Sequence, residues 1–239
     1  MIFQTELLRA FLIFTANPIL IITSLVIAFK ILIRRRVRLT YSLGFFYILL
    51  SLSLGINLIF FLVSLFYKNE FLLFFLYYLS SVLVFFPFIF LMLFIADLNY
   101  GEEVVTNRVY TISLIVLGIV SILVYLFPGG ITINESTNWT PQFSWTFLIF
   151  IYIMFTAFVT IPLTILITKL YHKFLAPHLK KKFRYFLLGI IFFLTIPYGV
   201  VLFNTWDEVI FKTFWSLYSL VIIILSGILI YIGIAKNIS

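Results

Sequence analysis

Six uncharged polar or amphipathic side chains fall at a similar depth near one end of the apolar segments of this chain. Amide, hydroxyl and indole groups form hydrogen bonds without carrying charge, and in an apolar setting they usually face protein rather than lipid. They could therefore line a pocket with hydrogen-bonding groups set in an aromatic wall. The alternative is that the amides join neighbouring helices, while the aromatic rings lie at a membrane–water boundary. These residues are Asn17, Asn57, Trp145, Tyr152, Asn204 and Trp206.

Residues suited to catalysis or metal binding form no recognised motif. The chain has no Cys, which excludes a disulfide, a thiolate metal site and a thiol nucleophile. His172 and His178 are six positions apart, with no carboxylate between them. Asp97, Glu102 and Glu103 lack further ligands, so we interpret them as a solvated helix boundary. With no HExxH or GxSxG pattern, we expect neither catalysis, nor a metal, nor a cofactor.

The elements that position these residues follow from composition. Apolar residues make up 64% of the chain and charged residues 10%, against about 45–50% and about 25% in soluble domains. Because a membrane-crossing helix needs about 20 apolar residues, the sequence predicts an all-α membrane protein. The predicted fold is a single seven-transmembrane helix bundle over residues 1–239, with spans at about 10–33, 41–66, 71–95, 109–127, 144–168, 185–203 and 213–235.

The basic residues predict the orientation of this bundle. Thirteen of the 16 Lys and Arg residues fall in one set of alternate loops, and such loops are cytoplasmic in membrane proteins. We therefore predict an N-out/C-in, multi-pass protein of the cell membrane. Two glycosylation sequons, at Asn134 and Asn138, fall on the predicted outer side.

The cytoplasmic basic clusters predict the contacts of the inner face. Lys and Arg near a membrane surface attract anionic lipid headgroups, and a docking surface for a protein partner is the alternative. We expect no nucleic acid partner, because the high pI of 9.6 reflects topology rather than a soluble basic face. The residues in question are Arg34, Arg35, Arg36, Arg38, Lys180, Lys181, Lys182 and Arg184.

Proline occurs in four of the predicted spans, as Pro18, Pro87, Pro162 and Pro197. An interior proline removes a backbone hydrogen bond and kinks its helix. Such kinks serve either as hinges or as packing features. No Asp, Glu or His falls in the middle of a predicted span and the last span has no Lys, which argues against an ion pump and a retinal protein.

Three stretches carry a resemblance to a known family: RRRVRLTYSLGFF before the second span, FLYYLSSVLVFFPFIFLMLF in the third, and KKKFRYFLLGIIFFLTIPYGVVLF around the sixth. The chain resembles the seven-helix N-terminal sensor module of histidine kinases and diguanylate cyclases. The resemblance implies a receptor that binds a ligand outside and drives a cytoplasmic output. Only residues 236–239 follow the last predicted span, so we expect the signal to pass to another chain.

Two other functions stay open. Length and topology are similar to those of a sugar-facilitator family with seven helices in a three-plus-one-plus-three repeat. That family has prolines in its helices 1, 2, 5 and 6, whereas here the second span has none and Pro87 lies in the third. A facilitator for a small neutral solute, or a structural subunit of a membrane complex, is the alternative to a sensor.

Overall fold

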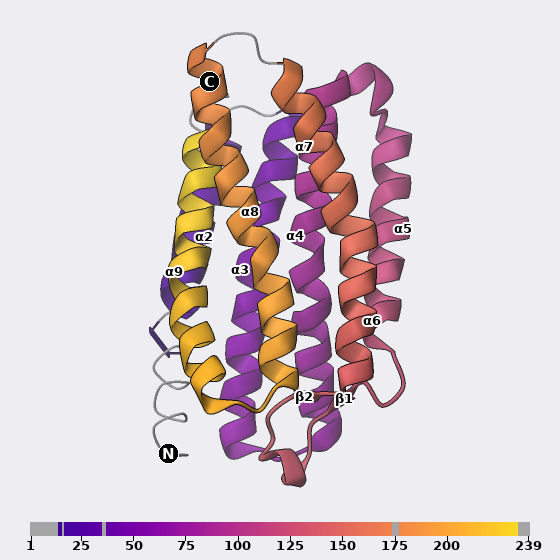
Figure 1. Cartoon of the computed structure of the whole chain (residues 1–239), viewed down its shortest axis with the longest axis vertical. Helices are drawn as coiled ribbons and strands as arrows, with labels where there is room; N and C mark the ends of the chain where they lie inside the picture. The colour runs from indigo at the N-terminus through magenta and orange to yellow at the C-terminus, as the bar shows by residue number, and fades with distance from the viewer. Residues whose placement is uncertain (1–13, 16, 35–36, 174–176, 234–239) are drawn as a thin grey trace.

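The computed structural model describes residues 14–15, 17–34, 37–173 and 177–233, and it is almost wholly helical (Figure 1). The π-helix η3 joins α6 and α7 into one rod. The elements are α2 (Asn17–Arg34), α3 (Arg38–Phe66), α4 (Glu70–Val104), α5 (Asn107–Tyr125), β1 (Ile131–Thr132), η2 (Glu135–Thr137), β2 (Gln142–Phe143), α6 (Trp145–Phe155), η3 (Thr156–Thr160), α7 (Ile161–Lys173), α8 (Pro177–Thr205) and α9 (Val209–Gly233).

The apolar runs of the sequence become these helices, which confirms the predicted all-helical fold class. Among the described residues, six helices are long and apolar enough to cross a membrane. The apolar part of α2, Asn17–Ile33, is shorter, and the first residues of the predicted span at 10–33 lie outside the described part of the chain. The seventh crossing therefore stays a prediction.

Capping side chains fix where several helices begin. The Asn69 side chain accepts a hydrogen bond from the Leu72 N–H at 2.9 Å, which caps α4. Ser144 caps α6 in the same way, through the Phe147 N–H at 3.3 Å. Each cap satisfies an N–H group that has no partner within its helix.

Helix α4 is longer than the sequence predicts. The apolar run ends near residue 95, but the helix continues to Val104, and its backbone leaves helical geometry at Gly101, where φ is 72°. Glycine adopts this left-handed conformation without a steric penalty. The segment predicted as a solvated loop after residue 95 is therefore mostly helix.

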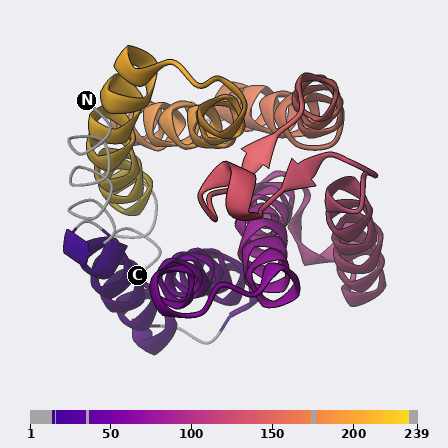
Figure 2. The same ribbon diagram turned by 90° about the horizontal axis from the view of Figure 1, so that it is seen from below.

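The helices surround a central space. In Figure 2, α3 and α4 lie on one side and α6, α7 and α8 on the other, with α2 and α9 along one flank. The closest packing joins α3 to α4, α8 to α9 and α2 to α3. The loop that carries β1, η2 and β2 lies across one end of this space (Figure 2), and we call that end the hairpin end. The opposite end is the basic end.

The predicted loop at 128–143 contains a short hairpin. Ile131 pairs with Phe143 and Thr132 with Gln142 in an antiparallel ladder. Phe143 is buried, and its ring contacts Phe147 of α6 at 5.2 Å and Tyr77 of α4 at 6.0 Å. These aromatic contacts hold the hairpin against the helix ends.

Four phenylalanine side chains from four helices meet in the interior and form an aromatic layer: Phe46 of α3, Phe88 of α4, Phe155 of α6 and Phe193 of α8. The ring centroids of Phe88 and Phe193 are 4.7 Å apart, those of Phe88 and Phe155 are 5.0 Å apart, and those of Phe46 and Phe193 are 5.1 Å apart. All four residues are at most 3% exposed, so the layer is buried in the interior of the bundle.

Glycine allows α8 and α9 to pack closely. A Cβ added at Gly189 would lie 2.9 Å from the backbone nitrogen of Ile230 and 2.9 Å from the carbonyl oxygen of Ser226. Backbone atoms cannot move aside as a flexible side chain can. Small residues of this kind let membrane helices approach each other.

We predict that Gly189→Ala lowers the free energy of unfolding by about 1–3 kcal/mol, because the methyl group must push α9 away from α8. The control is Gly55→Ala in α3, where an added Cβ meets nothing within 4 Å. Unfolding in mixed detergent micelles would measure both variants. Equal stability of the two would show that the α8–α9 contact is not as close as described.

Candidate functional site

A cavity in two adjacent compartments lies inside the bundle near the hairpin end. The mouth compartment has a volume of about 220 Å³ and is bounded by Asn17, Pro141 and Trp215, among others. The inner compartment has a volume of about 260 Å³ and extends between α3, α4 and α8. The two compartments are neighbours, since both are lined by Asn17, Asn57, Tyr77, Val200, Ser219 and Ile223.

The three asparagines predicted from the sequence meet at the mouth compartment. They come from three different helices: Asn17 from α2, Asn57 from α3 and Asn204 from α8. The Asn204 amide nitrogen donates to the Tyr77 hydroxyl at 3.0 Å and to the Val200 carbonyl at 3.1 Å. Both of its N–H groups are thus used, and only its side-chain oxygen can accept a hydrogen bond from a ligand.

The other two amides have no partner in the described part of the chain. The side chains of Asn17 and Asn57 are half-buried and form no hydrogen bond with any described residue. A polar group in an apolar setting costs free energy unless it is hydrogen-bonded. These amides are therefore available to bind a molecule in the cavity.

The inner compartment offers mostly apolar surface. Its two most buried serines satisfy each other, since the Ser53 hydroxyl donates to the Ser80 carbonyl at 3.0 Å and the Ser80 hydroxyl to the Ser53 carbonyl at 3.1 Å. No charged side chain lines either compartment among the residues that the structure describes. Among the described residues, the cavity wall is thus uncharged, and its two unpartnered amides, Asn17 and Asn57, line both compartments.

The aromatic layer closes the cavity toward the basic end. Along α4 and α8, the lining residues nearest the basic end are Phe88 and Phe193. Their rings pack against each other, with Phe46 next to Phe193. A molecule that enters from the hairpin end therefore stops at this layer.

The other three residues of the predicted pocket lie outside the cavity. The Tyr152 hydroxyl donates to the Tyr198 carbonyl at 2.7 Å. Trp145 is exposed, and Trp206 is exposed and stacks on Phe211 with ring centroids 5.3 Å apart. These three side chains lie at a depth similar to that of the asparagines, but they do not face the cavity.

The lining residues that were not predicted include Tyr77, Trp215 and Ser219. Tyr77 positions the Asn204 amide, and the other two belong to α9. Ser216 and Ser219 both line the mouth compartment, and their spacing of three places them on one face of the helix. That polar pair in an apolar run was the available signal.

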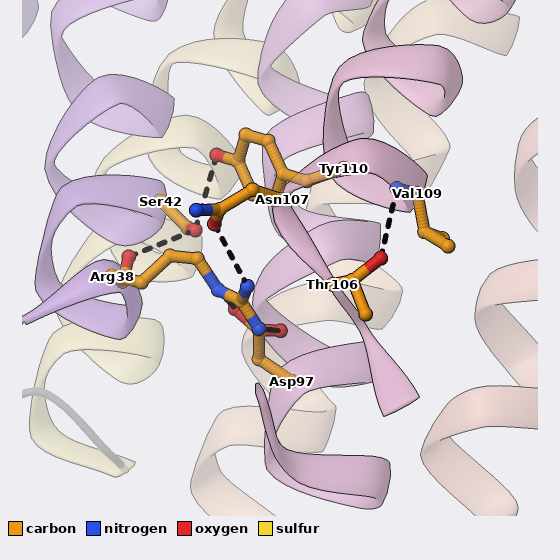
Figure 3. A network of polar contacts seen from close by, with 7 residues as sticks. All are labelled: Arg38, Ser42, Asp97, Thr106, Asn107, Val109 and Tyr110. Carbon is orange, nitrogen blue, oxygen red and sulfur yellow. Dashed lines mark hydrogen bonds and ion pairs between the residues drawn. The ribbon is translucent and has the colours of Figure 1, made fainter. Parts of the chain in front are cut away.

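At the basic end, Arg38 of α3 holds Asp97 of α4 (Figure 3). The Arg38 Nε–Asp97 Oδ2 distance is 2.9 Å and the Nη2–Oδ1 distance is 2.5 Å. Asp97 is only 5% exposed. The prediction of a solvated carboxylate is therefore wrong for Asp97, and Arg38 binds a buried partner rather than presenting its charge to a lipid headgroup. The longer α4 is the reason, because it carries Asp97 into the bundle.

The same network reaches α5. Arg38 Nη1 donates to the Asn107 side-chain oxygen at 3.3 Å, and the hydroxyls of Ser42 and Tyr110 are 3.3 Å apart. Figure 3 shows these side chains grouped around the Arg38–Asp97 pair. Three helices are thus joined through charged and polar side chains at this end.

A second group of contacts ties α4 to α7. The Asn99 amide donates to the Leu166 carbonyl at 2.7 Å, and Lys173 donates to the Asn99 carbonyl. Lys169 donates to the Tyr100 hydroxyl at 3.2 Å. The end of α7 is therefore held to α4 next to the Arg38 network.

The other residues predicted to contact lipid or a partner lie either at the basic end or outside the described residues. Lys181, Lys182 and Arg184 are exposed on α8, and the Lys180 ammonium lies 6.0 Å from the centroid of the Tyr171 ring. Arg35, Arg36 and the Arg34 side chain fall outside the described residues. Contact of these cations with lipid or with a partner stays a prediction.

Comparison with known proteins adds no relative. No family model matches the chain, and neither a curated protein nor a solved structure matches it. The resemblance to the sensor module therefore stays a prediction, and the argument for function rests on the cavity and the two ends of the bundle.

We predict that Asp97→Leu lowers the free energy of unfolding by about 3–5 kcal/mol, because Arg38 keeps a largely buried charge without its partner. The double variant Arg38→Met/Asp97→Leu should recover most of this loss, since apolar side chains can replace a buried ion pair. Unfolding in mixed micelles measures both. A double variant no more stable than the single one would show that the pair does not carry the effect.

Proposed function

We propose that this chain is a receptor-like membrane protein, oriented N-out/C-in, that binds a small uncharged molecule in the cavity and acts through other chains without catalysis. The observation that carries this proposal is that the amides of Asn17 and Asn57 line the cavity and that, among the described residues, they have no hydrogen-bond partner and no charged neighbour in its wall. A receptor needs a site that is incomplete until its ligand binds, and these amides provide one.

Exposed apolar surface supports the membrane setting. Along α5, Ile112, Ile115, Val116 and Ile119 are each 51–55% exposed. Water-soluble monomers rarely expose contiguous apolar patches of this kind. In a bilayer the same side chains face lipid at no cost.

Charge distribution supports the orientation. Lys169 and Lys173 end α7, and the exposed cations of α8 lie near its start, so both groups belong to the end opposite the hairpin. Among the described residues, Lys68 and Lys212 are the only basic residues at the hairpin end. By the positive-inside rule, this distribution favours a cytoplasmic basic end and an external cavity mouth.

A continuous set of contacts supports transmission from the cavity to the basic end. Pro197 of α8 lines the inner compartment, and the hydroxyl of the next residue, Tyr198, lies 2.6 Å from the Thr156 hydroxyl and 2.9 Å from that of Thr160. Both threonines belong to η3, and π-helical turns are frequent at functional sites. Movement of α8 on binding would thus reach α7, which Lys173 and Asn99 tie to α4.

A facilitator for a small neutral solute is the second candidate. The cavity lies between α2, α3 and α4 on one side and α8 and α9 on the other, as alternating access requires. Transport would require Phe88 and Phe193 to separate. Uptake of glycerol by proteoliposomes, above the protein-free rate, would favour this candidate over the receptor.

Cysteine labelling can test the N-out/C-in orientation, because the chain has no Cys of its own. In intact cells, a membrane-impermeant maleimide should label Ser136→Cys in the hairpin loop but not Lys181→Cys at the basic end. Permeabilised cells serve as the control, where both should react. The reverse pattern would overturn the N-out/C-in orientation.

We predict that Ser219→Cys, in the cavity wall, reacts with uncharged methyl methanethiosulfonate at least about tenfold faster than with an anionic methanethiosulfonate of similar size. The reason is that an ion must lose its hydration to enter an uncharged cavity. Ser136→Cys, which is exposed, should show no such preference.

The rates follow from mass spectrometry of quenched samples. If Ser219→Cys reacts with neither reagent, no accessible cavity exists and the proposed function fails. If it reacts equally with both, the cavity does not select against charge.

A further inference from the structure

We infer that the ligand of this cavity is an uncharged single-chain amphiphile, with a hydrogen-bonding head at Asn17, Asn57 and Asn204 and an apolar tail in the inner compartment. The inference rests on the proposed function, since it names the ligand class of the same site. It follows from the position of the polar groups: the amides of Asn17 and Asn57 line both compartments, next to Asn204 at the mouth, whereas the wall beyond them toward the aromatic layer is mainly apolar.

The mouth compartment defines the head. The amides of Asn17 and Asn57 can each donate and accept, whereas Asn204 has both N–H groups engaged and can only accept. A head that satisfies all three must donate at least one hydrogen bond and accept others. A hydroxyl or an amide does both, whereas a ketone or a simple ester cannot donate.

The absence of charge in the wall excludes an ionic head. Neither compartment is lined by Asp, Glu, Lys, Arg or His within the described part of the chain. Taking an ion out of water without a counter-charge is far costlier than burying a hydroxyl. Fatty acids and alkyl ammonium ions therefore fit this site poorly.

The inner compartment defines the tail. Ser53 and Ser80 are satisfied by each other's carbonyls, and beyond Asn17 and Asn57 the wall toward the aromatic layer is mainly apolar, with Val84, Phe85 and Ile196. Water is unfavourable in that apolar part, since it needs two to four polar partners. An alkyl chain fills it without leaving a polar group unpaired.

The depth of the cavity sets the length and direction of the ligand. The tail would run from the hairpin end toward the aromatic layer, where Phe88 and Phe193 stop it. A head at the membrane boundary and a tail toward the bilayer centre is also how a lipid lies in the adjacent leaflet. The site thus accepts a short amphiphile in the orientation that such a molecule already has in the membrane.

The test measures the fluorescence emission of Trp215, which lines the mouth compartment. A variant with Phe at positions 139, 145 and 206 keeps Trp215 as the one tryptophan of the four in the chain. This protein, in lipid nanodiscs, is titrated with 1-monooctanoylglycerol. We expect a saturable change in Trp215 emission.

Three comparison compounds each remove one feature of the proposed ligand. Octanoate carries an anionic head, octyltrimethylammonium a cationic head, and glycerol has no tail. Each should bind at least about tenfold more weakly than 1-monooctanoylglycerol.

Variants connect the signal to the amides. Asn17→Leu/Asn57→Leu should weaken binding of 1-monooctanoylglycerol at least about tenfold, while Asn138→Gly, at an exposed loop position, should not change it. Asn57→Asp is the second variant: it should turn the preference toward octyltrimethylammonium, a gain that an unfolded protein could not show.

The outcomes separate this inference from the proposed function. Octanoate or glycerol binding as tightly as 1-monooctanoylglycerol would overturn the ligand class. A response that never saturates, and is unchanged in the double Leu variant, would show partition into lipid and overturn it as well. In either case the reactivity of Ser219→Cys would still decide whether the cavity is accessible at all.

Discussion

The structure depends on one constraint: a polar group away from water must find its hydrogen bonds within the protein. The backbone meets it by being helical almost throughout the described residues. Buried side chains meet it in pairs, as Ser53 and Ser80 do, or through a carbonyl of another helix, as when Tyr47 donates to Gly227 at 2.9 Å. The half-buried amides of Asn17 and Asn57, which have no hydrogen-bond partner among the described residues, come from two helices and line the same cavity. A bound molecule that forms hydrogen bonds with both would meet the same constraint.

The two ends of the bundle differ in the charge and the hydrogen bonding of their polar side chains. At the hairpin end, polar groups are uncharged and partly unsatisfied. At the basic end, charged and polar side chains are paired across α3, α4, α5 and α7, most closely in the Arg38–Asp97 pair. The aromatic layer separates the two regions. Binding at one end can therefore alter the other only by moving helices, and α8 with its Pro197 is the helix that contacts both the cavity and the π-helical turn.

Much of the fold could be predicted from the sequence, because apolar run length reports directly on helices that face lipid. The span predicted at 109–127 is the helix Asn107–Tyr125, for example. Helix ends were harder to predict: α4 continues beyond its apolar run and carries Asp97 into the bundle, where Arg38 pairs with it. Pairing between residues about 60 positions apart leaves no local signal in the sequence. The short hairpin was missed for a similar reason, since each strand has two residues.

The candidate site was half predictable. Depth along the helices follows from position in each span, and it placed Asn17, Asn57 and Asn204 correctly at one level. Rotation about the helix axis does not follow from depth, so Tyr152 bonds to Tyr198 instead and two tryptophans face outward. Ser219 and Trp215 enter the site only because α9 packs beside α8 and α2, which is a property of the assembled bundle.

The most direct test is an experimental structure of the protein purified in nanodiscs with its native membrane lipids. We expect density for a bound molecule in the mouth compartment, within hydrogen-bonding distance of the Asn17 and Asn57 amides, and an intact aromatic layer beneath it. A cavity filled by side chains, with both amides bonded to neighbouring helices, would contradict this expectation.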